Sequence, residues 1–83
     1  MAQPAPTATV LNAREEGSGP AVVLLHGLGG DHTVWNAVIP ELTERFHVFA
    51  LDLRGHGRTR APEGSTYSFA EMEADLAAFL ETL

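Results

Sequence analysis

Two glycine-rich segments, each directly after an apolar run, carry the residues of this chain that could do chemistry. The first run, residues 22–25, leads into His26-Gly27-Leu28-Gly29-Gly30. The second run, residues 48–53, leads into residues 54–59, which read Arg-Gly-His-Gly-Arg-Thr. Glycines after a strand let the backbone approach a ligand closely and point its N–H groups at it. Such N–H groups can hold the negative charge that develops during acyl transfer.

The two apolar runs predict the scaffold that positions these segments. Each run is continuously apolar, which is typical of a strand buried on both faces of a parallel sheet. A helix-length segment separates the runs, so we expect both strands to end at the same edge of one sheet. In open α/β sheets this carboxyl edge is where ligands bind. The sequence therefore predicts an α/β fold with a site at that edge.

The chain around these strands predicts further elements. Residues 1–6 indicate an extended lead, residues 7–13 a β-leaning segment and residues 14–20 a polar turn. Residues 7–20 together predict a β-ribbon element that leads into the first buried strand. Residues 33–46 carry apolar side chains at a helical period. We expect Pro40 to divide this segment and to be the first residue of a short second helix.

The last part of the chain predicts one longer helix. Ser68 and Glu71 have the spacing of a capping box, so the helix is expected to begin at Phe69 and to continue to the last residue. Its acidic side chains are expected to face solvent or to complement the helix dipole. They are Glu71, Glu73, Asp75 and Glu81.

Taken together, the two segments resemble the opening of an α/β-hydrolase. The resemblance rests on residues 26–30, then Trp35, then residues 52–59, which read Asp-Leu-Arg-Gly-His-Gly-Arg-Thr. It is closest to the esterase, lactonase and haloperoxidase-like branch. It implies that residues 7–83 are the first, incomplete part of a three-layer sandwich, a mostly parallel sheet with flanking helices. Thr59 stands where the family more often has serine, and both residues offer a hydroxyl to the turn.

The nucleophile that the family uses is absent from this sequence. It is a serine on a strained strand-to-helix turn, in the pattern G-x-S-x-G. Ser18 would need glycines at positions that hold Glu16 and Pro20, and no other serine has the flanking glycines. The aspartate version of the pattern, G-x-D-x-G, is absent as well. The acid and the histidine of the triad follow the nucleophile in chain order, so this sequence does not contain them.

The resemblance implies a parent reaction, the hydrolysis of a small ester or lactone by that missing serine, with no cofactor. The backbone N–H of Leu28 would help to hold the oxyanion, and Gly27 and Gly29 would give the loop its geometry. Three further residues are candidates for the wall of the substrate pocket: Gly30, His32 and Trp35. For His32, a polar role at the start of a helix is an equally good interpretation. For Trp35, the alternative is a position in the apolar core. The 83-residue chain alone is expected to be inactive.

Other polar residues favour structural roles. His26 lies before the nucleophile in chain order, so we expect it to brace the loop through ring hydrogen bonds rather than to act in catalysis. His47, at a strand start, and His56, in a turn, also favour structural roles. A tight turn held by charge and glycine conformations is the favoured interpretation of Asp52, Arg54, Gly55 and Gly57. The histidines lack metal-ligand spacing, and no metal site is predicted.

The charge and cysteine content of the sequence exclude some classes of binding partner and some kinds of chemistry. Eleven acidic and five basic residues give a net charge of −6, which argues against nucleic acid or an anionic membrane surface. The absence of cysteine excludes disulfides and a cysteine nucleophile. The first residues lack the basic and apolar regions of a secretory signal, and no segment is long enough to span a bilayer, so a cytoplasmic protein is expected. The expected partner of the complete protein is a small ester-like substrate.

Three alternatives accompany this interpretation. Dehalogenases and epoxide hydrolases with an aspartate nucleophile share the same opening. The second alternative is that the chain is a non-catalytic truncated fragment or a piece of an assembly. In that case residues 22–25 are expected to form an open apolar strand edge that favours aggregation or self-association. Nucleotide binding is disfavoured, because a G-x-G-x-x-G pattern that begins at Gly27 would need glycine at the position of His32.

Overall fold

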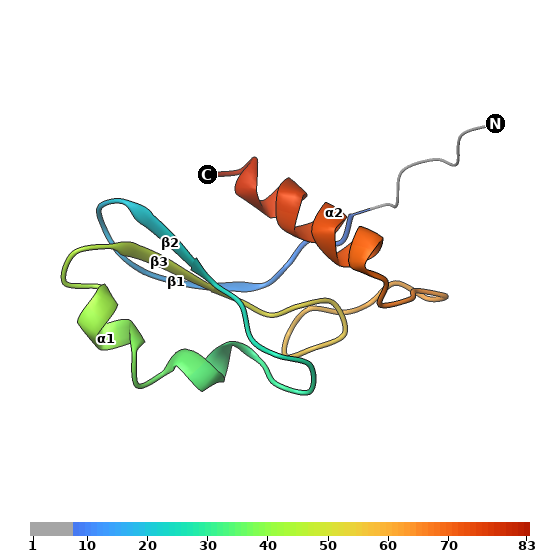
Figure 1. Cartoon of the computed structure of the whole chain (residues 1–83), viewed down its shortest axis with the longest axis horizontal. Helices are drawn as coiled ribbons and strands as arrows, with labels where there is room; N and C mark the ends of the chain where they lie inside the picture. The colour runs from blue at the N-terminus through green and yellow to red at the C-terminus, as the bar shows by residue number, and fades with distance from the viewer. Residues whose placement is uncertain (1–7) are drawn as a thin grey trace.

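The computed structural model of the chain describes residues 8–83 (Figure 1). Its elements, in chain order, are β1 (Ala13–Gly17), β2 (Ala21–Leu24), the 3-10 helix η1 (His32–Trp35), α1 (Ile39–Leu42), β3 (His47–Leu51) and α2 (Phe69–Leu80). The extended lead that the sequence predicts for residues 1–6 lies outside the described residues. Within the described part of the chain, no helix is long and apolar enough to cross a membrane.

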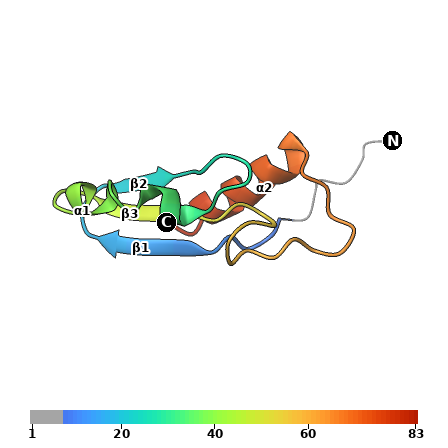
Figure 2. The ribbon, with the colours of Figure 1, turned by 90° about the horizontal axis from the view of Figure 1, so that it is seen from below.

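The three strands form one mixed sheet in the order β1-β3-β2 (Figure 2). β2 is parallel to β3, with Val22 opposite Val48 and Leu24 opposite Ala50. β1 is antiparallel to β3, with Ala13 opposite Leu51. The two apolar strands therefore end at the same edge of the sheet, as predicted. The outer edge of β2 pairs with no strand among residues 8–83.

The side chains of β3 alternate between two apolar clusters. Phe49 and Leu51 belong to the cluster that packs against α2. Val48 and Ala50 belong to the cluster that packs against η1 and α1. The sheet thus lies between α2 on one face and the two short helices on the other (Figures 1 and 2). This confirms the predicted α/β layering, in a small and incomplete form.

The predicted β-ribbon element before β2 contains a strand, but it lies later in the chain than the sequence predicted. Residues 14–20 were expected to form a polar turn, but residues 14–17 belong to β1 and the turn is confined to the residues that follow. Among the described residues of the β-leaning segment, only Ala13 lies in a strand. Glu15 accepts a hydrogen bond from His47 Nε2 at 2.9 Å across the β1–β3 pair. An antiparallel edge strand that faces solvent needs no apolar run, which is why the sequence pattern did not locate its residues.

Pro40 divides the segment between the apolar strands, as predicted. The first part is a single 3-10 turn, η1, rather than an α-helix. The second part is α1, in which Pro40 lies in the first turn and Val38 is the N-cap. Proline is tolerated there because the first N–H groups of a helix have no partner within it.

The predicted capping box of α2 is only half formed. The Ser68 hydroxyl accepts the N–H of Glu71 at 3.2 Å, as predicted. The Glu71 carboxylate does not return to the helix start. It accepts the N–H of Thr66 at 3.1 Å and a hydrogen bond from the Arg54 guanidinium at 2.7 Å.

Arg54 fixes α2 to the carboxyl end of β3. Its Nε and Nη2 donate to Asp75 Oδ2 and Oδ1 at 2.7 and 2.8 Å. Arg54 and Asp75 are only 2% and 1% exposed. The prediction that Asp75 faces solvent was therefore wrong, because a buried guanidinium takes the place of water. Burial alone would raise the pKa of Asp75, but the hydrogen bonds from Arg54 and from the N–H of Thr9, together with the charge of Arg54, lower it below its usual value.

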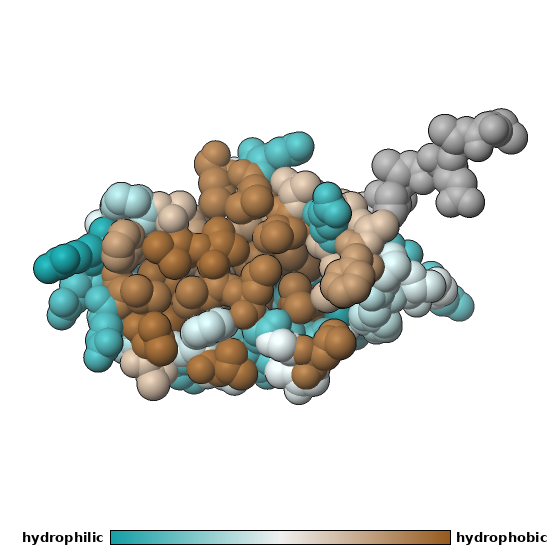
Figure 3. All heavy atoms as spheres, in the orientation of Figure 1, coloured by the Kyte–Doolittle hydropathy of each residue, from teal (hydrophilic) through white to brown (hydrophobic). Residues whose placement is uncertain are grey.

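Several large apolar side chains of the sheet end and the helices are exposed. Leu25, Val34 and Phe69 are 41%, 56% and 91% exposed. A groove lined by Leu25, Leu53 and Phe69, among others, runs between the end of the sheet and α2. Figure 3, which has the orientation of Figure 1, shows a broad apolar area over the strands and α2. This face has the character of an interior rather than of a solvated surface.

Candidate functional site

The segment after β2 closes into a tight turn. The N–H of Gly30 donates to the carbonyl oxygen of Gly27 at 3.1 Å. Gly29, the third residue of the turn, has a φ of 85°, a positive value that a type II turn requires and that favours glycine. Leu28 is the second residue of the turn and is 76% exposed. The structure therefore brings the predicted loop residues together at the carboxyl end of β2.

The two N–H groups in the middle of this turn have different environments. The N–H of Gly29 donates to Nε2 of His56 at 3.0 Å. The N–H of Leu28 has no acceptor among the described residues. An N–H that the fold leaves without a partner is open to an acceptor on a ligand.

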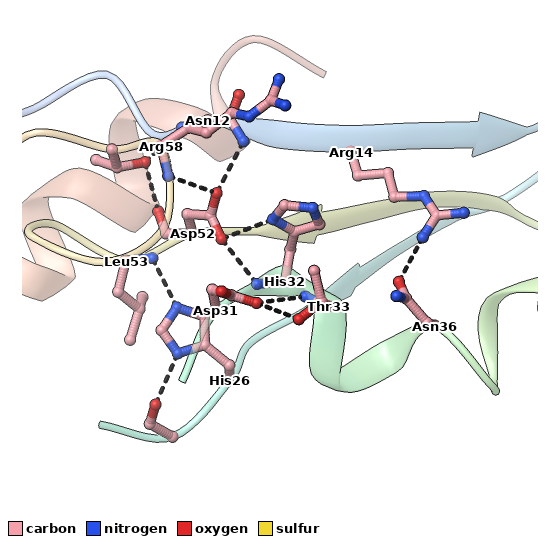
Figure 4. A network of polar contacts seen from close by, with 12 residues as sticks. Asn12, Arg14, His26, Asp31, His32, Thr33, Asn36, Asp52, Leu53 and Arg58 are labelled. Carbon is pink, nitrogen blue, oxygen red and sulfur yellow. Dashed lines mark hydrogen bonds and ion pairs between the residues drawn. The ribbon is translucent and has the colours of Figure 1, made fainter. Parts of the chain in front are cut away.

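Two histidines tie this turn to the segment after β3. His26 Nε2 accepts the N–H of Leu53 at 3.0 Å, and its Nδ1 lies 2.7 Å from the carbonyl oxygen of Gly27 (Figure 4). His56 Nδ1 lies 2.9 Å from the carbonyl oxygen of Arg54. Because an N–H only donates and a carbonyl only accepts, these partners assign a neutral ring with the proton on Nδ1 to both histidines. The expected bracing role of His26 is confirmed.

Asp52 is the centre of the turn after β3. Its fully buried carboxylate accepts at Oδ1 from the N–H and the ring Nδ1 of His32, at 2.7 and 2.8 Å. Oδ2 accepts from Asn12 Nδ2 at 2.8 Å and from the N–H of Arg58 at 3.1 Å (Figure 4). Burial alone would raise the pKa of Asp52, but these hydrogen bonds outweigh it and lower the pKa far below its usual value. Gly57 has a φ of 51°, and a Cβ there would overlap the carboxylate.

Thr59 closes the same turn. Its buried hydroxyl donates to the carbonyl oxygen of Asp52 at 2.8 Å and accepts the N–H of Asn12 at 2.7 Å. The predicted tight turn held by charge and glycine conformations is thus confirmed. Sequence reasoning missed Asn12, because an isolated polar residue before a strand carries no signal of a partner 40 positions away.

The other two candidates for the pocket wall, His32 and Trp35, lie at the two ends of η1. His32 turns its ring toward Asp52 and keeps 19% of its side chain exposed. Trp35 packs against the cluster that contains Ile39 and Val48. Its indole Nε1 is buried without a hydrogen-bond partner among the described residues. The structure therefore joins His32 to the buried carboxylate and sets Trp35 in the apolar layer.

One group of side chains has the donor types of a metal site. The ligand atoms of Asp31, His32 and Asp52 lie within 4.8 Å of one another. Asp31 is the N-cap of η1, and its Oδ1 accepts from both the hydroxyl and, at 2.8 Å, the N–H of Thr33. These bonds, the hydroxyl first, lower the pKa of Asp31. The carboxylate oxygens of this group thus already accept hydrogen bonds that cap η1 and hold the buried turn after β3.

Comparison with known proteins identifies the family. The family model described as alpha/beta hydrolase fold matches residues 20–83. A 2-(acetamidomethylene)succinate hydrolase of Mesorhizobium japonicum is 37% identical over 73 residues, which cover 88% of this chain and 26% of that protein. A fluoroacetate dehalogenase of a Burkholderia species is 38% identical over 77 residues, which cover 88% of this chain and 25% of that protein.

A solved structure agrees with these relatives. A marine microorganism esterase superposes with a TM-score of 0.81 at 34% identity, over 90% of this chain and 28% of that one. The chain spans between 11% and 26% of the length of the curated relatives described for it. Since the family model covers most of these 83 residues and the fold agrees, the chain belongs to the α/β-hydrolase fold family and corresponds to an N-terminal part of its fold.

Proposed function

We propose that this chain supplies the oxyanion-holding turn of a hydrolase that cleaves small esters or lactones with a serine outside these 83 residues. The observation that carries the proposal is the N–H of Leu28, which is held in a tight turn and has no acceptor among the described residues. An oxyanion needs a donor that is oriented before the reaction begins. The esterase and the hydrolase among the relatives support this class of reaction.

In the proposed reaction the serine oxygen attacks the acyl carbon, and its proton passes to a histidine that also lies outside this chain. The carbonyl oxygen gains the negative charge and accepts the hydrogen bond of Leu28. The histidine then gives its proton to the leaving oxygen as the ester bond breaks. A water molecule, activated by the same histidine, next attacks the acyl carbon, and the acid leaves as the serine regains its proton. Gly27 and Gly29 keep the turn in shape, and Gly30, His32 and Trp35 contribute to the pocket wall or its support.

His26 and Asp52 are poor candidates for the acid–base step. Both ring nitrogens of His26 are bound to backbone groups. Asp52 is fully buried and accepts hydrogen bonds at both oxygens, so its proton affinity is too low for a base at neutral pH. In this proposal both residues build the site and neither exchanges a proton with the substrate.

Replacement of Leu28 by proline tests the role of its N–H. Proline suits the second position of a type II turn, so Leu28→Pro removes the N–H and keeps the turn. Leu28→Ala is the matched control, because it keeps the N–H and shortens a side chain that is mostly exposed. Both variants are made in a chimera in which the chain replaces the matching segment of the marine esterase.

We expect Leu28→Pro to lower kcat for p-nitrophenyl acetate by about 100- to 1,000-fold, the usual loss for one oxyanion donor. Leu28→Ala should stay close to the unmodified chimera. Equal rates for the proline and alanine variants would refute the proposed role of the N–H.

A second candidate is a dehalogenase or epoxide hydrolase with an aspartate nucleophile. The fluoroacetate dehalogenase among the relatives favours it. The nucleotide sequence that follows the codon of Leu83 distinguishes the two. A strand that ends in G-x-S-x-G supports the serine hydrolase, and one that ends in G-x-D-x-G supports the second candidate. A frame that continues with neither pattern favours a non-catalytic fragment.

A further inference from the structure

A series of hydrogen bonds joins the turn after β2 to α2. The N–H of Gly29 donates to Nε2 of His56, and Nδ1 of His56 donates to the carbonyl oxygen of Arg54. Arg54 is in turn held by the buried carboxylate of Asp75. The orientation of the Gly29 peptide, and with it the turn that contains Leu28, therefore depends on the ring of His56.

The ring of His56 is held by its neighbours as well as by its nitrogens. The ring of His26 lies 5.0 Å away, and the ring of Tyr67 meets it edge-on at 6.5 Å. A Cβ on Gly55 would overlap the phenol of Tyr67, so this aromatic side chain packs directly on the segment that carries His56. With contacts on two sides and a bond at each nitrogen, the ring has one orientation.

We propose that His56 is a positioning residue for the oxyanion turn and that it acts only as the neutral ring with its proton on Nδ1. The inference rests on the proposed function of Leu28. A doubly protonated histidine has two N–H donors and no acceptor. Its Nε2 could then no longer accept the hydrogen bond from the N–H of Gly29. Acidification therefore separates the turn from its anchor on Arg54.

The described groups that contact the His56 ring include no carboxylate. From the turn after β2 it faces His26, and from the segment before α2 it faces Tyr67. In its own segment, Arg54 is paired with acidic side chains of α2, and Arg58 donates its N–H to Asp52. Among the described residues, no carboxylate makes a hydrogen bond to the His56 ring.

Amide hydrogen exchange at Gly29, measured in the 83-residue chain, tests the inference. The amide of Gly64 is the internal reference, because it has no acceptor among the described residues. We expect Gly29 to exchange at least about tenfold more slowly than Gly64 at neutral pH and to lose this protection on acidification. The ring ¹⁵N shifts of His56 should place the proton on Nδ1.

Two variants separate the hydrogen bond from general stability. His56→Ala should remove the protection of Gly29, whereas His56→Gln, which offers a neutral acceptor oxygen, should keep it at both neutral and acidic pH. His47→Ala is the matched control, since that ring bonds to Glu15 at the far end of the sheet. The amides of β3 report whether each variant is folded.

A proton on Nε2, or a Gly29 that exchanges as fast as Gly64 in the unmodified chain, would overturn the inference. Equal Gly29 exchange in the unmodified chain and His56→Ala would do so too. In the esterase chimera, His56→Ala should lower kcat by about 10- to 100-fold with KM unchanged, and His56→Gln should restore it. If Leu28→Pro abolishes activity but His56→Ala does not, the proposed function stands and the positioning role is wrong. If Leu28→Pro has no effect, the proposed function is wrong, and the exchange data still decide the hydrogen bond.

Discussion

Replacement of Asp75 by asparagine tests how α2 is fixed to the sheet. The substitution keeps the size of the side chain but removes its charge, and it turns an amide NH₂ toward the N–H groups of Arg54. The side chain of Arg54 is 3% exposed, so its guanidinium cannot turn to water instead. Among the described residues, Glu71 is a second charged partner of Arg54, and its Oε2 lies 2.7 Å from Nη1.

The size of the effect follows from this geometry. Removal of one member of a buried ion pair costs about 3–5 kcal/mol. Because Glu71 still balances part of the charge, we expect the lower end, about 3 kcal/mol of the free energy of unfolding. A chain of this length is stabilised by roughly 4–12 kcal/mol, at the usual stabilisation per residue. Asp75→Asn is therefore expected to remove a large part of the free energy of unfolding of the chain.

Urea unfolding provides the measurement. The fluorescence of Trp35, the single tryptophan of the sequence, and the far-ultraviolet circular dichroism follow the transition. Glu73→Gln is the matched control, because Glu73 lies on the same helix but is exposed; we expect a change within about 0.5 kcal/mol. Equal unfolding midpoints for the Asp75 and Glu73 variants, at equal slopes, would refute the reasoning.

Three further predictions concern stability and association. The pKa of Asp75 is lower in the folded than in the unfolded chain. Its contribution to the free energy of unfolding is therefore complete above the unfolded pKa of about 3.9 and is lost as the pH falls through the folded pKa. Urea midpoints should fall more steeply in acid for the unmodified chain than for Asp75→Asn, and parallel plots of midpoint against pH would contradict this. Gly57→Ala should cost about 2–3 kcal/mol in urea unfolding, because its Cβ would displace the buried carboxylate of Asp52. Gly64→Ala, which has the same sign of φ but no close neighbour, should cost about 1 kcal/mol, and equal losses would argue against the clash. We also propose that the chain self-associates through the open edge of β2, so that sedimentation velocity shows species larger than a monomer and Leu25→Lys shifts them toward the monomer; an unmodified chain that stays monomeric would contradict the proposal.

The parts of the fold that apolar side chains determine could be predicted from the sequence. Continuous apolar runs located β2 and β3 to within two residues at each end, and both faces of β3 are buried as expected. Pro40 marked the break between two short helices, and Ser68 marked the start of α2. The glycines after each strand indicated tight turns at one edge of the sheet. In each case a local pattern reports directly on the backbone.

The parts that depend on distant partners could not be predicted in the same way. β1 is polar and is defined by its pairing with β3, so its own residues carry little signal. The burial of Asp75 depends on Arg54, 21 residues earlier. A sequence signal did exist here, because Asp75 lies three residues after Met72 and four before Phe79, within the apolar stripe of the helix. A carboxylate in such a stripe indicates a buried cation elsewhere in the chain.

The position of the Leu28 turn at the end of an edge strand suggests a use for this segment as one half of a split reporter. β2 ends in the turn and has no neighbour on its outer side within the described residues. Under the proposed function, the donor for the oxyanion lies in this piece and the nucleophile in another, so neither piece hydrolyses an ester alone. Signal would arise only when a bait and a prey, fused to the two pieces, bring strand beside strand. The background of such an assay would be set by the affinity of the open edge, which a lysine at Leu25 is expected to weaken.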